Sequence, residues 1–151
     1  MKQPTTFKSI YTLFSVLLVG QVFLAVVIAF LIPELEIDNV LRFTQRSMIV
    51  LATLVGAGLA SFLVYRRRIK QGASLTGLPV KLEHYRASNI IRWAILEGVN
   101  LLIIVIAFLE SYPRMLWFLA PGLAIFLRTS PSKEGFINDY QLTAQEQSEL
   151  G

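Results

Sequence analysis

Long apolar runs dominate this 151-residue chain and leave few ways for it to fold in water. The four runs are residues 10–32, 48–65, 90–109 and 112–127. A helix needs roughly 20 mostly apolar residues to cross a hydrocarbon core about 30 Å thick, and these runs approach that length without the polar face of a soluble amphipathic helix. Because lipid offers no hydrogen bonds to a bare backbone, the runs predict helices that cross a bilayer.

Composition supports the same class of protein. Hydrophobic residues make up 54% of the chain and charged residues only 16%, whereas soluble domains carry about 25% charged residues. The polar segments between the runs are too short to bury a core of their own, so we expect no enzymatic activity and no catalytic residues. The chain has no cysteine and a single histidine, and we therefore expect neither a metal site nor a cofactor.

The predicted fold is an all-α polytopic membrane protein with four transmembrane helices in an antiparallel bundle over residues 1–127. The expected helices cover about 10–32, 47–66, 87–109 and 112–127. Residues 128–151 are predicted to form a cytoplasmic or interfacial tail with a short helix, because Thr143 and Glu146 have the spacing of a capping box. Pro121, near the middle of the last run, predicts a kink there.

Basic residues are distributed unevenly between the connections. The segment from Arg66 to Arg86 holds six of them, and cytoplasmic connections carry such an excess. We therefore expect a multi-pass protein of a bacterial inner membrane with both termini in the cytoplasm. The net charge of +4 is explained by membrane lipids as partners, and no nucleic acid is expected. The cluster within this segment is either a binding site for anionic head groups or an anchor of topology: Arg66, Arg67, Arg68 and Lys70.

Small residues recur along one flank of the second run. Ala52, Gly56 and Ala60 are spaced by four, and Gly58 lies beside them. Such a flank lets another helix backbone approach closely, which is a principal source of helix association in lipid. The flank predicts helix packing, either against a helix of the same chain or against a second copy.

A polar stripe runs along the third run. Its members fall within an arc of roughly 140° at 100° per residue: Asn89, Arg92, Trp93, Glu97 and Asn100. Glu97 lies about 16 Å along the helix from Ala87, close to the bilayer midplane. Ionisable residues at this depth are costly and usually face protein or an ion path. Glu97, with Asn100 one turn further on, is therefore either an ion- or proton-binding carboxylate or an interhelical hydrogen-bonding group.

Residues 48–109 contain three segments in order: a small-residue helix with Gly56 and Gly58, a polar connection, and a second helix with Leu96, Glu97 and Gly98. This order resembles the hairpin of the ATP-synthase proteolipid, subunit c, in which a carboxylate in mid-membrane carries an ion. The resemblance implies an ion-binding role for Glu97.

Two functions follow as expectations. The first is a structural or accessory subunit of a membrane assembly, which associates with itself or with a larger membrane complex. The alternative is a membrane subunit that binds a proton or cation at Glu97. The first is preferred, because a conducting path needs polar residues on several helices, and the first and last runs offer little beyond Gln21.

Overall fold

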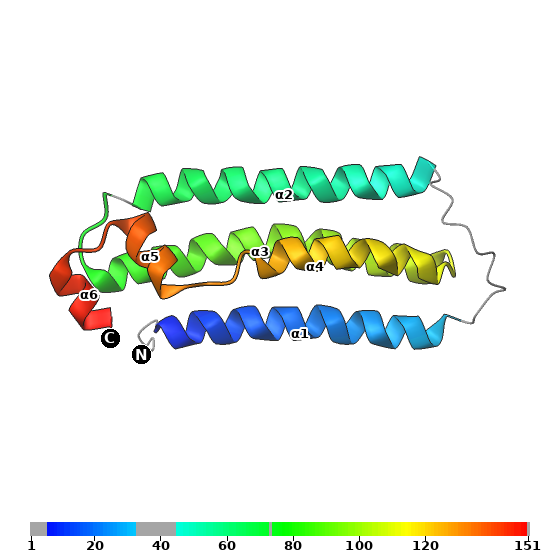
Figure 1. The fold of residues 1–151 in the computed structure, drawn as a ribbon, viewed down its shortest axis with the longest axis horizontal. Coiled ribbons are helices and arrows are strands. Elements are labelled where there is room, and N and C mark those ends of the chain that lie inside the picture. The colour runs from blue at the N-terminus through cyan, green and yellow to red at the C-terminus, as the bar shows by residue number, and fades with distance from the viewer. Residues whose placement is uncertain (1–5, 33–44, 73, 151) are drawn as a thin grey trace.

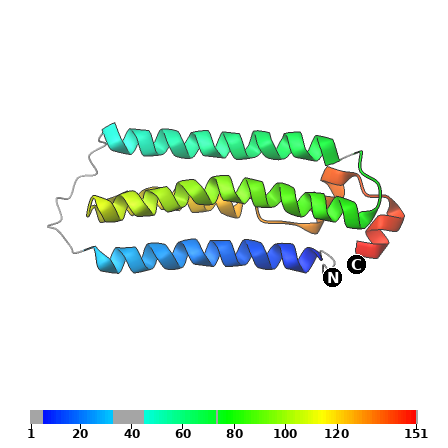
Figure 2. The same ribbon diagram turned by 180° about the vertical axis from the view of Figure 1, so that it is seen from behind.

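The computed structural model describes residues 6–32, 45–72 and 74–150, and all regular elements in this part of the chain are helices (Figures 1 and 2). Helices α1 (Phe7–Leu31), α2 (Gln45–Gly72) and α3 (Leu78–Leu109) lie side by side. Each of the three is long and apolar enough to cross a membrane. The all-α prediction is confirmed, and the helix lengths are those of a multi-pass membrane protein. The first residues of the predicted cytoplasmic N-terminus and the connection over 33–44 lie outside the described part.

Helix α3 begins at Leu78, well before the predicted start near residue 87. Gly77 precedes it with φ 87°, a conformation that glycine adopts without steric cost, and Pro79 occupies the first turn, where its fixed φ suits a helix. Helix α2 continues to Gly72. The sequence predicts a polar loop with helical extensions over 66–86, and the described part of this connection is mostly helix, because α2 ends at Gly72 and α3 begins at Leu78.

The last apolar run forms two shorter elements instead of one long helix. A 3₁₀ helix, η1 (Pro113–Phe118), leads into α4 (Leu119–Leu127), which runs alongside α3 (Figure 1). Pro121 falls in the first turn of α4, where backbone N–H groups lack intrahelical acceptors and the missing donor costs little. The proline thus lies next to a 3₁₀-to-α junction, in place of the expected kink within a continuous helix.

Two short helices follow, α5 (Lys133–Tyr140) and α6 (Ala144–Leu150). They lie at the end of the bundle where α1 begins (Figure 1). Phe136 and Tyr140 of α5 are 0% and 1% exposed, within one core cluster with Phe14 and Trp93. The tail is therefore packed into the bundle end, where α4 has already finished. A second cluster, around Leu54 and Ile103, fills another part of the bundle.

Candidate functional site

A pair of buried amides joins α1 to α3. Asn100 Nδ2 donates a hydrogen bond of 2.7 Å to Gln21 Oε1, and the two side chains are 0% and 1% exposed. The other polar atoms of the pair, Gln21 Nε2 and Asn100 Oδ1, are buried without a hydrogen-bond partner in the described chain. Sequence reasoning placed Asn100 beside Glu97, but its hydrogen bond is made to Gln21 instead.

Helix α4 passes very close to this pair. A Cβ atom added at Gly122 would collide with Asn100 Oδ1 and would lie 3.3 Å from Leu54 Cδ1. Only glycine allows this approach without displacing the amide. This role for Gly122 was not predicted from the sequence. The position of Gly122 directly after Pro121 in an apolar run is the sequence signal from which the role could have been inferred. The pair and Gly122 together fix α1, α3 and α4 at one level of the bundle.

Glu97 lies at the edge of the buried face of α3. It is three residues from Asn100, about 60° around the helix, and it is partly exposed beside the exposed Ala94 and Gly98. No hydrogen bond or ion pair joins its carboxylate to any residue that the structure describes. Among the described residues there is also no group of three or more His, Cys, Asp or Glu that could hold a metal ion. A complete ion-coordinating shell around Glu97 is therefore not formed by the described part of this chain.

The small-residue flank of α2 faces outward. Ala52, Gly56 and Ala60 are exposed, and Gly56 lies about 200° around the helix from the buried Leu54. A Cβ atom at Gly56 would meet nothing within 4 Å. Gly58 differs, because it is half-buried and its added Cβ would lie 3.8 Å from a side-chain atom of α4. Apart from Gly58, the flank is not covered by any described helix of the same chain.

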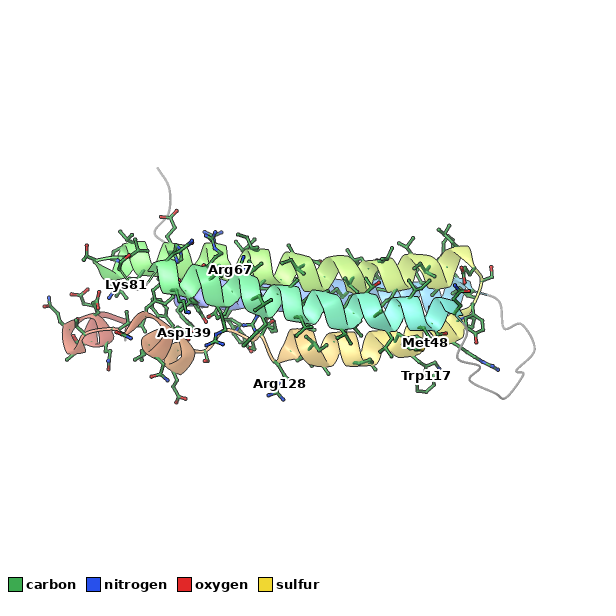
Figure 3. All side chains as sticks on the ribbon, turned by 90° about the horizontal axis from the view of Figure 1, so that it is seen from above. Met48, Arg67, Lys81, Trp117, Arg128 and Asp139 are labelled. Atoms are coloured by element: carbon green, nitrogen blue, oxygen red, sulfur yellow. The ribbon has the colours of Figure 1, made fainter. Side chains whose placement is uncertain are left out.

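The basic cluster at the end of α2 divides into two kinds of contact. Arg68 Nε donates a hydrogen bond of 3.1 Å to Ser88 Oγ on α3, so this arginine joins two helices. Arg66, Arg67 and Lys70 are exposed, and Arg67 points away from the bundle (Figure 3). Three of the four predicted head-group or anchor residues are thus directed outward.

Polar contacts hold the tail against α2 and α3, and the sequence did not reveal them. Tyr65 donates a 2.6 Å hydrogen bond to Asp139, and Lys81 Nζ lies 2.9 Å from Glu146 Oε2. The Lys81 and Thr143 hydrogen bonds lower the pKa of Glu146. Burial raises the pKa of Tyr140 to about 12. The spacing of Phe136 and Tyr140, one helical turn apart, is the signal from which docking of the tail could have been inferred.

Comparison with known proteins leaves the site to be interpreted from its own geometry. No protein-family model, curated protein or solved structure matches this chain. The described part of the chain is an all-helical bundle with three helices long and apolar enough to cross a membrane, as in a multi-pass membrane protein. Two polar features lie within these apolar helices, the buried pair of Gln21 and Asn100 and the partly exposed Glu97.

Proposed function

We propose that this chain is a structural or accessory subunit of a membrane assembly and crosses a bacterial inner membrane four times with both termini in the cytoplasm. The six residues of η1 and nine of α4 together rise about 25 Å, close to the thickness of a hydrocarbon core. The start of α1 and the tail helices lie at the same end of the bundle (Figure 2). The basic residues around the α2–α3 turn lie at this end too, as a cytoplasmic side would have.

The observation that carries this proposal is the outward position of the small-residue flank. Large apolar side chains form the usual lipid-facing surface, and on α1 this surface includes Phe30, which is 86% exposed. Helix α2 also exposes large apolar side chains such as Val55 and Leu59, but among them it places the small residues Ala52, Gly56 and Ala60 on its outer face. Apolar side chains gain little by moving from lipid into a helix interface, because lipid is itself apolar. Close approach of helix backbones at small residues therefore drives helix association in a membrane. The flank is suited to receive a helix of another membrane chain or of a second copy.

Glu97 supports the same proposal. Its partly exposed carboxyl group would meet hydrocarbon in an isolated bundle, at a depth where ionisable side chains are rarely left facing lipid. A neighbouring subunit that covers this side of α3 would remove the unfavourable contact. Glu97→Gln keeps the hydrogen-bonding capacity, so we expect it to be tolerated in the assembly.

The test compares two identical substitutions on outward helix faces. Gly56→Leu places a bulky side chain on the flank, whereas Gly20→Leu adds it to α1, where a Cβ atom also meets nothing within 4 Å. Native membranes are solubilised gently, and each variant is run on native gels and purified with its partners. We expect the Gly56→Leu variant to show neither a high-mass species nor copurifying chains, and the Gly20→Leu variant to show both. A wild-type chain that is monomeric in chemically crosslinked native membranes would refute the proposal.

A proton- or cation-binding subunit is the second candidate. The specific observation in its favour is that the Glu97 carboxylate has no partner in the described chain and is reachable from outside the bundle. This candidate predicts that a hydrophobic carbodiimide labels Glu97 and that a bound cation protects it. Glu97→Gln would then abolish labelling and activity with assembly intact. Absence of labelling in the native membrane would count against an ion-binding carboxylate.

A further inference from the structure

A groove of about 380 Å³ opens between α2 and the end of α4. Arg92 of α3 and Arg128 at the end of α4 line it, together with the buried Ser61 and Thr129. None of the described residues that line the groove is acidic. The groove is therefore a cationic recess in an otherwise apolar surface.

The groove exists because the chain leaves the helical path after Leu127. Thr129 Oγ1 donates a 2.6 Å hydrogen bond to the carbonyl of Phe126, and Trp93 Nε1 donates one of 3.3 Å to the carbonyl of Thr129. These bonds hold the segment between α4 and α5 against α3, and the groove lies between this segment and α2. Arg128 is exposed and extends outward from the end of α4 (Figure 3).

The two arginines lie at the same depth, although they are far apart in sequence. Arg92 is 17 residues before Leu109, which is about 26 Å along α3 at 1.5 Å per residue. Arg128 follows directly after the stretch Pro113–Leu127, whose length is about 25 Å. In a hydrocarbon core about 30 Å thick, both long side chains reach the boundary at which lipid phosphates lie.

Arg92 is held in place but is not neutralised by an ion pair. Its guanidinium carbon lies 4.6 Å from the centre of the Tyr65 ring, and its Nε is buried without a hydrogen-bond partner in the described chain. Asp139 is the acidic group that interacts with Arg92 electrostatically, but Asp139 accepts its hydrogen bond from Tyr65. The ring contact fixes the plane of the guanidinium and leaves its edge donors available for planar recognition of a phosphate.

We propose that this groove binds the phosphodiester of an anionic phospholipid from the cytoplasmic leaflet. Arg92 and Arg128 supply the donors, because the hydroxyls of Ser61 and Thr129 already donate to the backbone carbonyls three residues before them. The groove continues past Val55 and Leu59, which are 53% and 60% exposed on α2. An acyl chain can lie along these residues, which favours a lipid over free phosphate.

The test uses native mass spectrometry of the detergent-solubilised full chain with added phosphatidylglycerol or phosphatidylcholine. We expect wild type to retain the anionic lipid preferentially. Arg128→Gln should weaken retention about ten-fold, the loss of roughly one charge-assisted contact. Arg86→Gln, which replaces an exposed arginine of α3 outside the groove, should leave retention unchanged. Because the Arg128 side chain is exposed, its replacement is not expected to impair folding, whereas Arg92→Gln also removes the contact with Tyr65.

Each outcome decides the proposal. Equal loss of lipid in Arg86→Gln and Arg128→Gln would show only diffuse attraction to basic side chains and would overturn it. Displacement of the lipid by millimolar inorganic phosphate would assign the groove to a small anion instead. Retention of both lipids with the same affinity would also overturn it. A melting temperature that phosphatidylglycerol raises in wild type and in Arg86→Gln, but not in Arg128→Gln, would support a specific lipid site.

Discussion

Asn100 and Gln21, which are 79 positions apart in the chain, form a hydrogen bond of 2.7 Å in the interior of the bundle. This bond matters for α1 in particular. Within that helix, the buried residues are Ile10, Phe14 and Gln21, so most of its surface faces outward. A polar contact between helices is directional, unlike apolar packing in lipid, and it therefore specifies how α1 is rotated and positioned against α3.

Replacement of one amide should cost more than replacement of both. Asn100→Leu leaves the Gln21 amide buried without its partner, and we expect a loss of about 1–3 kcal/mol in the free energy of unfolding. Adding Gln21→Leu removes that unpaired group. The loss of unfolding free energy in the double variant should therefore be smaller than the sum of the losses in the two single variants. Thermal or denaturant unfolding in detergent gives the four values of the cycle. Strict additivity would show that the hydrogen bond contributes no coupling.

Gly122→Ala should destabilise the bundle although it adds only one methyl group. The new Cβ would collide with Asn100 Oδ1, and overpacking of this kind costs about 1–3 kcal/mol. Gly98→Ala is the matched control, because its Cβ would meet nothing within 4 Å and alanine is the better helix former. We expect a lower melting temperature only for Gly122→Ala. A melting temperature equal to that of the control would mean that α4 can move away from Asn100 without cost.

Docking of α6 should weaken in acid. The Lys81 and Thr143 hydrogen bonds lower the pKa of Glu146 below its ordinary value of 4.5, so this contact stabilises the docked tail above that value and is lost as the pH falls through the folded-state pKa. Hydrogen exchange of the α6 amides between pH 6 and pH 3, corrected for the intrinsic rate, measures the loss.

Glu146→Gln should remove this pH dependence, because the amide cannot titrate. Glu149→Gln should retain the pH dependence, because Glu149 lies on the same helix but accepts a hydrogen bond from Gln145, whereas Lys81 pairs with Glu146. If both variants behave like wild type, another group controls the docking of α6.

The phenol of Tyr140 should lose its proton at a higher pH than an ordinary tyrosine. Burial raises its pKa to about 12 from an ordinary value of 10.0, and its hydroxyl lies 2.6 Å from His84 Nδ1. The contribution of the buried, protonated Tyr140 phenol to the free energy of unfolding is fully present below pH 10 and is lost as the pH rises toward 12. The difference in absorbance at 295 nm between wild type and Tyr140→Phe should show this late step. Titration near 10 would indicate that α5 is undocked in solution.

Membrane topology should place the tail and the start of α1 on one side. The chain has no native cysteine, so single cysteines at Ser9 and Ser148 can be tested without further replacements. An impermeant maleimide applied to sealed right-side-out vesicles should label neither position before lysis and both after it, while Ser111→Cys should react from outside. Labelling of Ser9→Cys and Ser148→Cys from opposite sides would exclude an even number of crossings.

The sequence predicted the three long helices because apolar runs of this length have few other structures available. It did not predict the early start of α3. Lys81, Leu82 and Tyr85 are buried there and form a short amphipathic face that the tail covers. Hydropathy alone predicts a polar loop for this segment. The buried pair was missed for a different reason. The sequence indicated polar residues at Gln21 and Asn100, but the partner of each depends on helix rotation, which is decided by non-local packing such as the approach of Gly122.

Helix α5 completes the aromatic cluster that contains Phe14 and Trp93. Because α5 follows α1 to α4 in the chain, its residues are synthesised after theirs, and this end of the bundle can close only once they have been made. Until then, the aromatic side chains of the cluster lack the cover that Phe136 and Tyr140 provide.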